Sequence, residues 1–142
     1  MKILSVQILL LLIFADLNAQ NVEVIIKGIR SEKGQIGIGI FKDDHTFQKE
    51  EPFLNKNFVK SVISNREMKV QFSLEPGIYG FALLDDENSN GLMEYNFLGI
   101  PKEGFGFSDY YHKGITKPKF DSFKFTIDKD QKKSITIRIR YM

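Results

Sequence analysis

The residues most capable of chemistry lie in one short acidic segment in the second half of the chain. Positions 86–91 read Asp-Glu-Asn-Ser-Asn-Gly, which matches the opening of a calcium-binding loop with an oxygen ligand at every second position. Alternate oxygen side chains can converge on one cation, and the glycine permits the sharp turn that brings the chain around it. The predicted calcium ligands are Asp86, Asn88, Asn90, the backbone carbonyl of Leu92, and Glu94.

The match to a calcium loop is incomplete. Phe97 stands where an EF-hand carries its bidentate glutamate, and the flanking residues are typical of strands, so a full site needs another oxygen from Asp85, Glu103 or Asp109. The alternative interpretation is an Asx-rich turn, in which Asn and Asp side chains cap their own backbone. The sequence leaves both interpretations open. Because two of the ligands are neutral asparagines, a calcium site here would be weak, at the roughly 10⁻⁴ to 10⁻³ M of extracellular modules.

A group of aromatic residues occupies the same part of the chain. It comprises Tyr95, Phe97, Phe105, Phe107, Tyr110 and Tyr111. Exposed rings stack on sugars or peptides, so Tyr95, Tyr110 and Tyr111 are the predicted ligand-binding residues, with a glycan or an envelope protein as the partner. The alternative is that the rings cover an open end of the fold, which the three phenylalanines of the group and the lack of tryptophan favour.

No arrangement of residues indicates an enzyme. His45 and His112 are the two histidines, Ser108 lies in no nucleophile motif, and the sequence contains no cysteine. Glu94 and Glu103 could form the carboxylate pair of a hydrolase, although any acidic loop offers such a pair. We therefore expect no catalytic residues and a non-catalytic module, with a carboxylate-based hydrolase as the alternative.

The beginning of the chain predicts export. Lys2 precedes an apolar run at positions 8–14, which is shorter than a membrane-spanning helix, and Ala19 supplies the small residue of a cleavage site. We expect a signal peptide over residues 1–19 and one domain over residues 20–142, located in the periplasm or outside the cell. The alternative is an uncleaved membrane anchor. With no cysteine to carry a lipid, cleavage would leave no membrane span or tether.

Alternation of apolar and polar residues predicts strands along the rest of the chain. They lie near residues 22–26, 36–40, 58–63, 70–74, 79–83, 123–127 and 135–141. About seven such strands predict an all-β, antiparallel two-sheet sandwich of immunoglobulin-like or transthyretin-like type. One long structured loop is expected over residues 85–120, and hairpin turns at 31–34 and 128–130. Residues 43–54 are compatible with either a helical turn or a loop that crosses between the sheets. Gly37 and Gly39 lack side chains, so one face of the strand at 36–40 is expected to be bare.

Composition narrows the class of partner. The net charge is +2 and the two signs are interspersed along the chain, which argues against nucleic acid. The length suits one hydrophobic core, and the lack of cysteine means that core packing, with or without a metal, must stabilise it.

Two sequence patterns resemble known families. The segment Leu-Glu-Pro-Gly-Ile-Tyr at 74–79 is similar to the turn that leads into a strand in transthyretin-like and carboxypeptidase-regulatory-like sandwiches. The order of this segment, the 85–91 acidic loop, Gly-Ile-Pro-Lys-Glu-Gly at 99–104 and Lys-Pro-Lys-Phe at 117–120 resembles the exported bacterial family called domain of unknown function 2141. The resemblance implies a β-sandwich and a location outside the cytoplasm. It implies no activity, and it makes Asp86, Asn88, Asn90, Pro101, Glu103 and Gly104 parts of a family motif.

Overall fold

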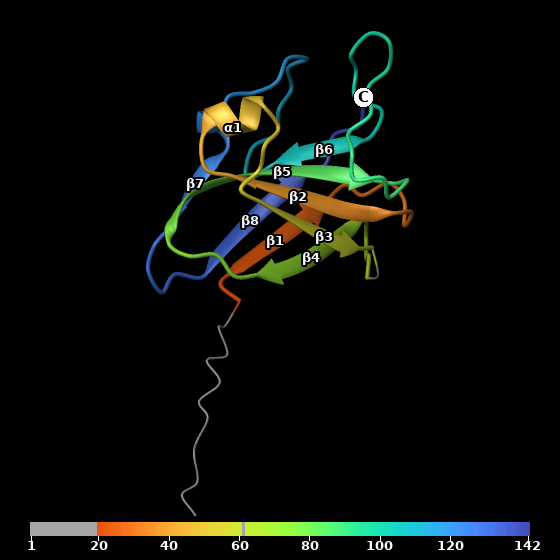
Figure 1. Ribbon diagram of the computed structural model, residues 1–142. Helices are drawn as coiled ribbons and strands as arrows, with labels where there is room; N and C mark the ends of the chain where they lie inside the picture. Colours follow the sequence, from red (N-terminus) through yellow and green to blue (C-terminus); the bar gives the residue numbers. More distant parts are fainter. Residues whose placement is uncertain (1–19, 61) are drawn as a thin grey trace, which may run out of the picture.

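The computed structural model describes residues 20–60 and 62–142 (Figure 1), so the predicted signal peptide lies outside the described residues. The described chain is built mainly of short strands. In order they are β1 (Val22–Lys27), β2 (Gln35–Phe41), helix α1 (Asp44–Gln48), β3 (Leu54–Val59), β4 (Glu67–Phe72), β5 (Gly77–Asp86), β6 (Gly104–Phe107), the 3-10 turn η1 (Phe120–Ser122), β7 (Lys124–Ile127) and β8 (Lys133–Arg138).

The strands form two sheets that pack face to face (Figure 1), which confirms the predicted all-β sandwich. The smaller sheet has the order β4-β1-β8, and the larger has the order β3-β2-β5-β6 with β7 also beside β5. Strands β7 and β6 share one edge of β5, because β7 pairs with its first residues and β6 with its last. The structure departs from the antiparallel prediction at β1 and β8, which pair in parallel.

Both predicted hairpins are wrong. The turn at 31–34 connects β1 of the smaller sheet to β2 of the larger, and the turn at 128–130 connects β7 to β8 in the same way. Turn residues specify that the chain reverses, but not which strand becomes the neighbour. The predicted strand at 58–63 is also misplaced, since β3 ends at Val59.

The segment from 85 to 120, predicted as a loop, contains strand β6. Helix α1 falls in the segment that the sequence left open, and Asp43 caps it by accepting a 2.8 Å hydrogen bond from the Thr46 backbone N–H. A helical turn between β2 and β3 therefore stands over the larger sheet (Figure 1).

Apolar residues fill two separate regions. The side chains on the inner face of each sheet form the core between the sheets, where Ile26, Ile38 and Phe81 are fully buried. The second region is an aromatic cluster of Phe41, Phe47, Phe107, Phe120 and Phe123. Phe41 and Phe107 belong to the faces of β2 and β6 that point away from the core, so this cluster covers part of the outer face of the larger sheet.

Two glycines with the same φ angle differ in how closely other atoms surround them. Gly34 lies in the connection between β1 and β2, and Gly99 serves as the comparison. Gly34 and Gly99 both have φ of +75°, but a Cβ on Gly34 would lie 2.7 Å from the Glu87 Cα, whereas a Cβ on Gly99 would meet nothing within 4 Å. Alanine at either site costs about 1 kcal/mol of left-handed strain. We expect Gly34→Ala to lower the free energy of unfolding by roughly 1–3 kcal/mol more than Gly99→Ala does, because the added methyl group overpacks the site. Equal losses in urea unfolding would contradict the close contact.

Candidate functional site

The end of β5 directs two neighbouring carboxylates to opposite sides of the larger sheet. Successive strand residues alternate in direction, so Asp85 follows Phe81 and Leu83 toward the core while Asp86 points to the other face. Both carboxylates are buried. Burial of an unpaired charge is costly, so each of them needs partners.

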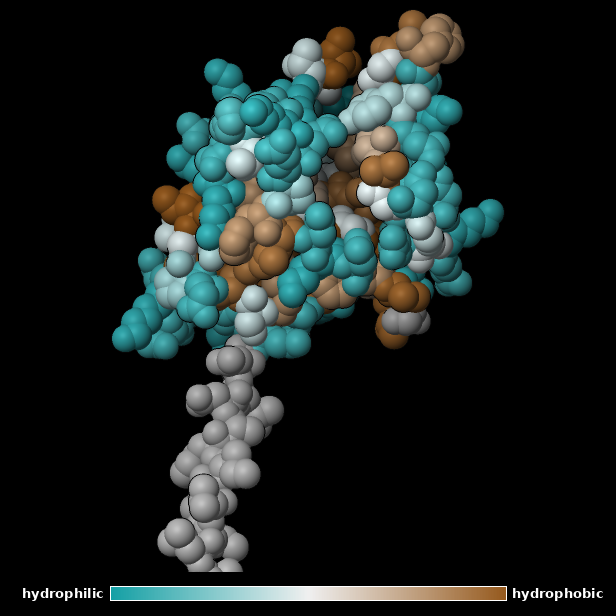
Figure 2. All heavy atoms as spheres, viewed as in Figure 1, coloured by the Kyte–Doolittle hydropathy of each residue, from teal (hydrophilic) through white to brown (hydrophobic). Residues whose placement is uncertain are grey.

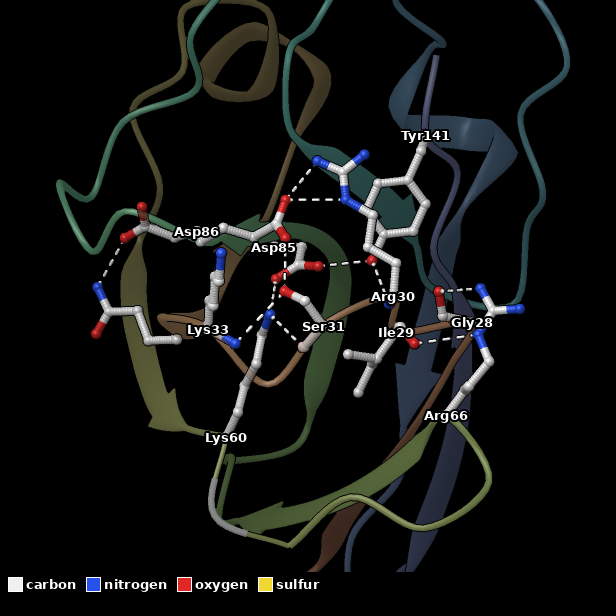
Figure 3. Close-up of polar contacts among 12 residues, drawn as sticks. Gly28, Ile29, Arg30, Ser31, Lys33, Lys60, Arg66, Asp85, Asp86 and Tyr141 are labelled. Atoms are coloured by element: carbon white, nitrogen blue, oxygen red, sulfur yellow. Dashed lines mark hydrogen bonds and ion pairs between the residues drawn. The ribbon is translucent and has the colours of Figure 1, made fainter.

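Asp85 belongs to a buried network at one end of the core (Figure 3). Its carboxylate forms an ion pair with the Lys60 ammonium, and both side chains are fully buried. The Tyr141 hydroxyl donates a 2.6 Å hydrogen bond to Asp85 and accepts a 3.0 Å bond from the Arg30 backbone N–H. Lys60 also donates to the Ser31 carbonyl at 3.0 Å. Burial raises the pKa of the Tyr141 hydroxyl, which keeps it a hydrogen-bond donor.

The network continues to the surface through Glu87. The Arg30 guanidinium donates to the Glu87 carboxylate at 3.0 Å, and the Ser31 hydroxyl donates to its second oxygen at 2.6 Å. The Arg30 hydrogen bond holds the pKa of Glu87 below its usual range. The β1–β2 connection is therefore tied by polar contacts to both sides of Asp86.

The Lys60–Asp85 pair gives a stability prediction. Removing one partner of a buried ion pair leaves an uncompensated charge, which costs about 3–5 kcal/mol. We expect Lys60→Met to lower the free energy of unfolding by this amount. Adding Asp85→Asn should recover part of the loss, because the neutral amide still accepts the Tyr141 hydrogen bond. Urea unfolding of the double-mutant cycle measures the coupling, and purely additive losses would contradict a paired network.

Asp86 organises the acidic loop that follows it. Its carboxylate accepts hydrogen bonds from the backbone N–H groups of Asn90 at 3.1 Å and Gly91 at 2.8 Å, and from the Gln35 side chain at 2.8 Å. The first two bonds close the loop on itself, and the third fixes it to β2. One buried carboxylate thus holds the turn at both its ends.

The other predicted calcium ligands gather around the same turn. The Asn88 side chain donates to Glu94 at 2.8 Å, and the Asn90 side chain donates to the same oxygen. The Asn88 amide oxygen accepts from the Asn90 N–H at 3.2 Å, and the Asn90 oxygen accepts from the Leu92 N–H at 2.9 Å. The structure therefore brings Asp86, Asn88, Asn90 and Glu94 together, in Asx turns.

Within residues 20–60 and 62–142, no three His, Asp or Glu side chains converge well enough to hold a metal ion by themselves. Of the further oxygens considered from the sequence, Asp85 is engaged by Lys60 and Tyr141, and Asp109 accepts a 2.8 Å bond from the Thr136 N–H. The third of these residues, Glu103, has a shifted pKa. Burial, and then the charge of Asp86, raise the pKa of Glu103.

A groove runs over the outer face of the larger sheet, with a volume of about 540 Å³. Its floor includes Gly39 and Ala82, which are cross-strand neighbours on β2 and β5, together with Leu84. Residues of α1, of the 91–101 segment and of the 112–118 segment form the walls. Figure 2 shows the surface hollowed between the part that carries α1 and the loop after β5, with brown, hydrophobic residues inside the hollow.

Three polar side chains of the groove are joined through Glu50. Lys117 donates to the Glu50 carboxylate at 3.1 Å, and the Tyr95 hydroxyl donates to the same oxygen at 3.4 Å. The two walls thus meet at Glu50. Burial, and then Glu50, raise the pKa of the Tyr95 hydroxyl. His112 hydrogen-bonds the Tyr110 hydroxyl at 3.2 Å and the Thr116 carbonyl.

The structure separates the predicted ligand-binding tyrosines. Tyr95 lies in the groove wall with its ring half-exposed. Tyr110 packs against the aromatic cluster, and Tyr111 is partly exposed outside the groove. Phe105 and Phe107 contribute to the groove from β6. The rings therefore neither form one platform nor all plug an end of the sandwich.

The sequence did not predict the groove. The groove combines residues from five separated parts of the chain, and the one local signal was the bare strand face at Gly37 and Gly39. Among the described residues, Glu50 is the single carboxylate that lines it. Glu94 and Glu103, which the hydrolase alternative requires, lie outside this lining.

Fold and surface together define an all-β sandwich module with an apolar groove on one sheet and an acidic loop at its border. The family model described as an uncharacterized protein conserved in bacteria, DUF2141, matches residues 24–136, and the chain belongs to that family. No curated protein and no solved structure matches the chain. No helix of the described residues is long and apolar enough to cross a membrane.

Proposed function

We propose that this protein is an exported, non-catalytic binding module, and that the groove over the larger sheet is its ligand site. The observation that carries the proposal is the groove itself. Sheet faces that point to solvent are ordinarily polar, whereas this one presents small and aromatic residues between two raised walls. Its volume of about 540 Å³ lies within the range of small-ligand sites, roughly 300–1,000 Å³.

The lining favours a ligand with an apolar body over a carbohydrate. A sugar needs several free hydrogen-bonding groups beside the ring on which it stacks, but Glu50, Lys117 and Tyr95 are already bonded to one another. An apolar group needs no such partners and gains about 25 cal/mol for each Å² removed from water. The Glu50–Lys117 pair at the edge would then face the polar end of the ligand.

Apolar side chains at the tips of both walls extend this surface. Phe97 and Ile115 are 95 % and 88 % exposed, and Leu92 and Leu98 are also largely exposed. Phe97 belongs to the loop after β5 and Ile115 to the opposite wall. Exposed apolar groups concentrated around one groove mark an interaction site. The ligand is therefore expected to reach beyond the groove and contact the tips.

Fluorescence of the neutral dye N-phenyl-1-naphthylamine tests the groove. We expect the native protein to bind the dye, and Leu84→Glu to weaken binding at least about tenfold, which corresponds to about 1.4 kcal/mol. The introduced carboxylate would have to lose water beneath the ligand. Leu84→Trp, which keeps the floor apolar but fills space, should weaken binding as well.

Ile78→Glu is the matched control. Ile78 points to the same side of β5 as Leu84 but lies outside the groove lining, so this variant should bind the dye as the native protein does. Near-ultraviolet circular dichroism verifies that each variant is folded. Equal dye binding by Leu84→Glu and the native protein would contradict the proposed site, and binding of soluble glycans but not the dye would favour the carbohydrate alternative.

Export is tested separately, by expressing the full chain in a bacterium and measuring its intact mass in each cell fraction. We expect a mature protein that begins at Gln20 and is recovered outside the cytoplasm. Leu11→Arg places a charge within the apolar run and should leave the uncleaved chain inside. Recovery of the native chain uncleaved in the membrane would support the anchor alternative.

A further inference from the structure

Two buried carboxylates, Asp86 and Glu103, lie at the end of the β5–β6 ladder, where β5 leads into the acidic loop. The β5–β6 ladder ends at the pair Asp85–Gly104, so Asp86 and Glu103 are the next residues on the two chain segments, just beyond the last paired residues. Asp86 is 1 % exposed and Glu103 is 7 % exposed. Like charges in this position repel, and burial strengthens the repulsion.

Asp86 is satisfied by hydrogen bonds, but Glu103 is not. One buried oxygen of Glu103, Oε2, has no hydrogen-bond partner among the described residues. The neighbouring Lys102 N–H donates at 2.8 Å to the carbonyl of Glu94, which brings the segment just before β6, where Glu103 lies, against the far end of the acidic loop. Glu103 therefore lies between the first and the last predicted ligand of that loop.

We propose that Asp86, Glu103 and the Asn88–Glu94 turn form a calcium site, with Glu103 as the ligand that replaces the missing glutamate of the loop pattern. Carboxylates alone do not complete it, so the amide oxygens of Asn88 and Asn90 and a backbone carbonyl supply the remaining ligands. A divalent cation converts the repulsion between Asp86 and Glu103 into attraction and gives Glu103 Oε2 a partner.

The chemistry of the donors selects the ion. All of them are hard oxygens from carboxylate, amide and carbonyl groups, and none is an imidazole or a thiolate, which zinc and copper prefer. Calcium accepts six to eight such ligands in irregular arrangements, whereas magnesium requires a near-octahedral set and retains its waters. A turn of flexible Asx side chains supplies the irregular arrangement that calcium accepts.

Calorimetric titration with calcium chloride and thermal melting test the site in the chain from Gln20. The native protein should bind calcium at millimolar concentration or tighter, and its melting midpoint should be higher in calcium than in chelator. Glu103→Gln has the same shape without the charge, and should bind calcium at least about tenfold more weakly. In chelator this variant should melt above the native protein, because the repulsion from Asp86 is gone, and in calcium the order should reverse.

Two further variants make the outcome decisive. Asn88 is exposed, so Asn88→Ala should fold and still lose affinity, and it replaces Glu103→Gln if that variant does not fold. Glu32→Gln removes an exposed carboxylate from the β1–β2 connection and should bind calcium normally. The proposal is overturned if calcium neither binds nor shifts the native midpoint. It is also overturned if calcium raises the melting midpoint of Glu103→Gln as much as that of the native protein. The same holds if Glu32→Gln loses as much calcium affinity as Glu103→Gln.

Discussion

The structure depends on the register of β5, because the two faces of this strand have different environments. One face supplies Phe81 and Leu83 to the core between the sheets, and the other supplies Ala82 and Leu84 to the floor of the groove. Both edges are also paired, with β2 on one side and with β6 and β7 on the other. A slip by one residue would exchange the two faces, placing Ala82 in the core and Phe81 in the groove. The buried Lys60–Asp85 pair at the end of the strand opposes a slip in the direction that would bring Leu84 to the place of Asp85, since Lys60 would then lose its carboxylate.

The sequence predicted the features that depend on local alternation and missed those that depend on distant partners. Period-two patterns located most strands and predicted the two-sheet sandwich, because one apolar face per strand must be buried. The neighbours of each strand are set by non-local packing, so two sheet-crossing connections were interpreted as hairpins. Strand β6 was missed since its Gly-Phe-Gly-Phe sequence is four residues long and rich in glycine. The glycines are required there: a Cβ on Gly106 would lie 2.6 Å from the Ile137 side chain.

The same distinction applies to the candidate sites. The turn at 86–94 was predicted because its hydrogen bonds join residues within eight positions of one another. The inward direction of Asp85 was also implicit in the sequence, because it continues the alternation of Tyr79, Phe81 and Leu83. Its partner Lys60 was not, since the pairing requires the two sheets to be assembled. The groove, whose lining extends from Gly39 to Met142, is a property of the tertiary structure alone.

The acidic turn and the groove are parts of one segment, and this has a thermodynamic consequence. The chain from Asp86 to Pro101 contributes few buried apolar side chains, so polar contacts at a few points must position it. Asp86 fixes its beginning to Gln35, the Glu94 carbonyl fixes its middle to Lys102, and Tyr95 reaches Glu50 across the groove. Ordering such a segment costs conformational entropy, and that cost is shared by every contact that orders it. An ion held at the turn and a ligand held against the Tyr95 wall would therefore favour each other, because whichever binds first has already ordered the segment that the second requires.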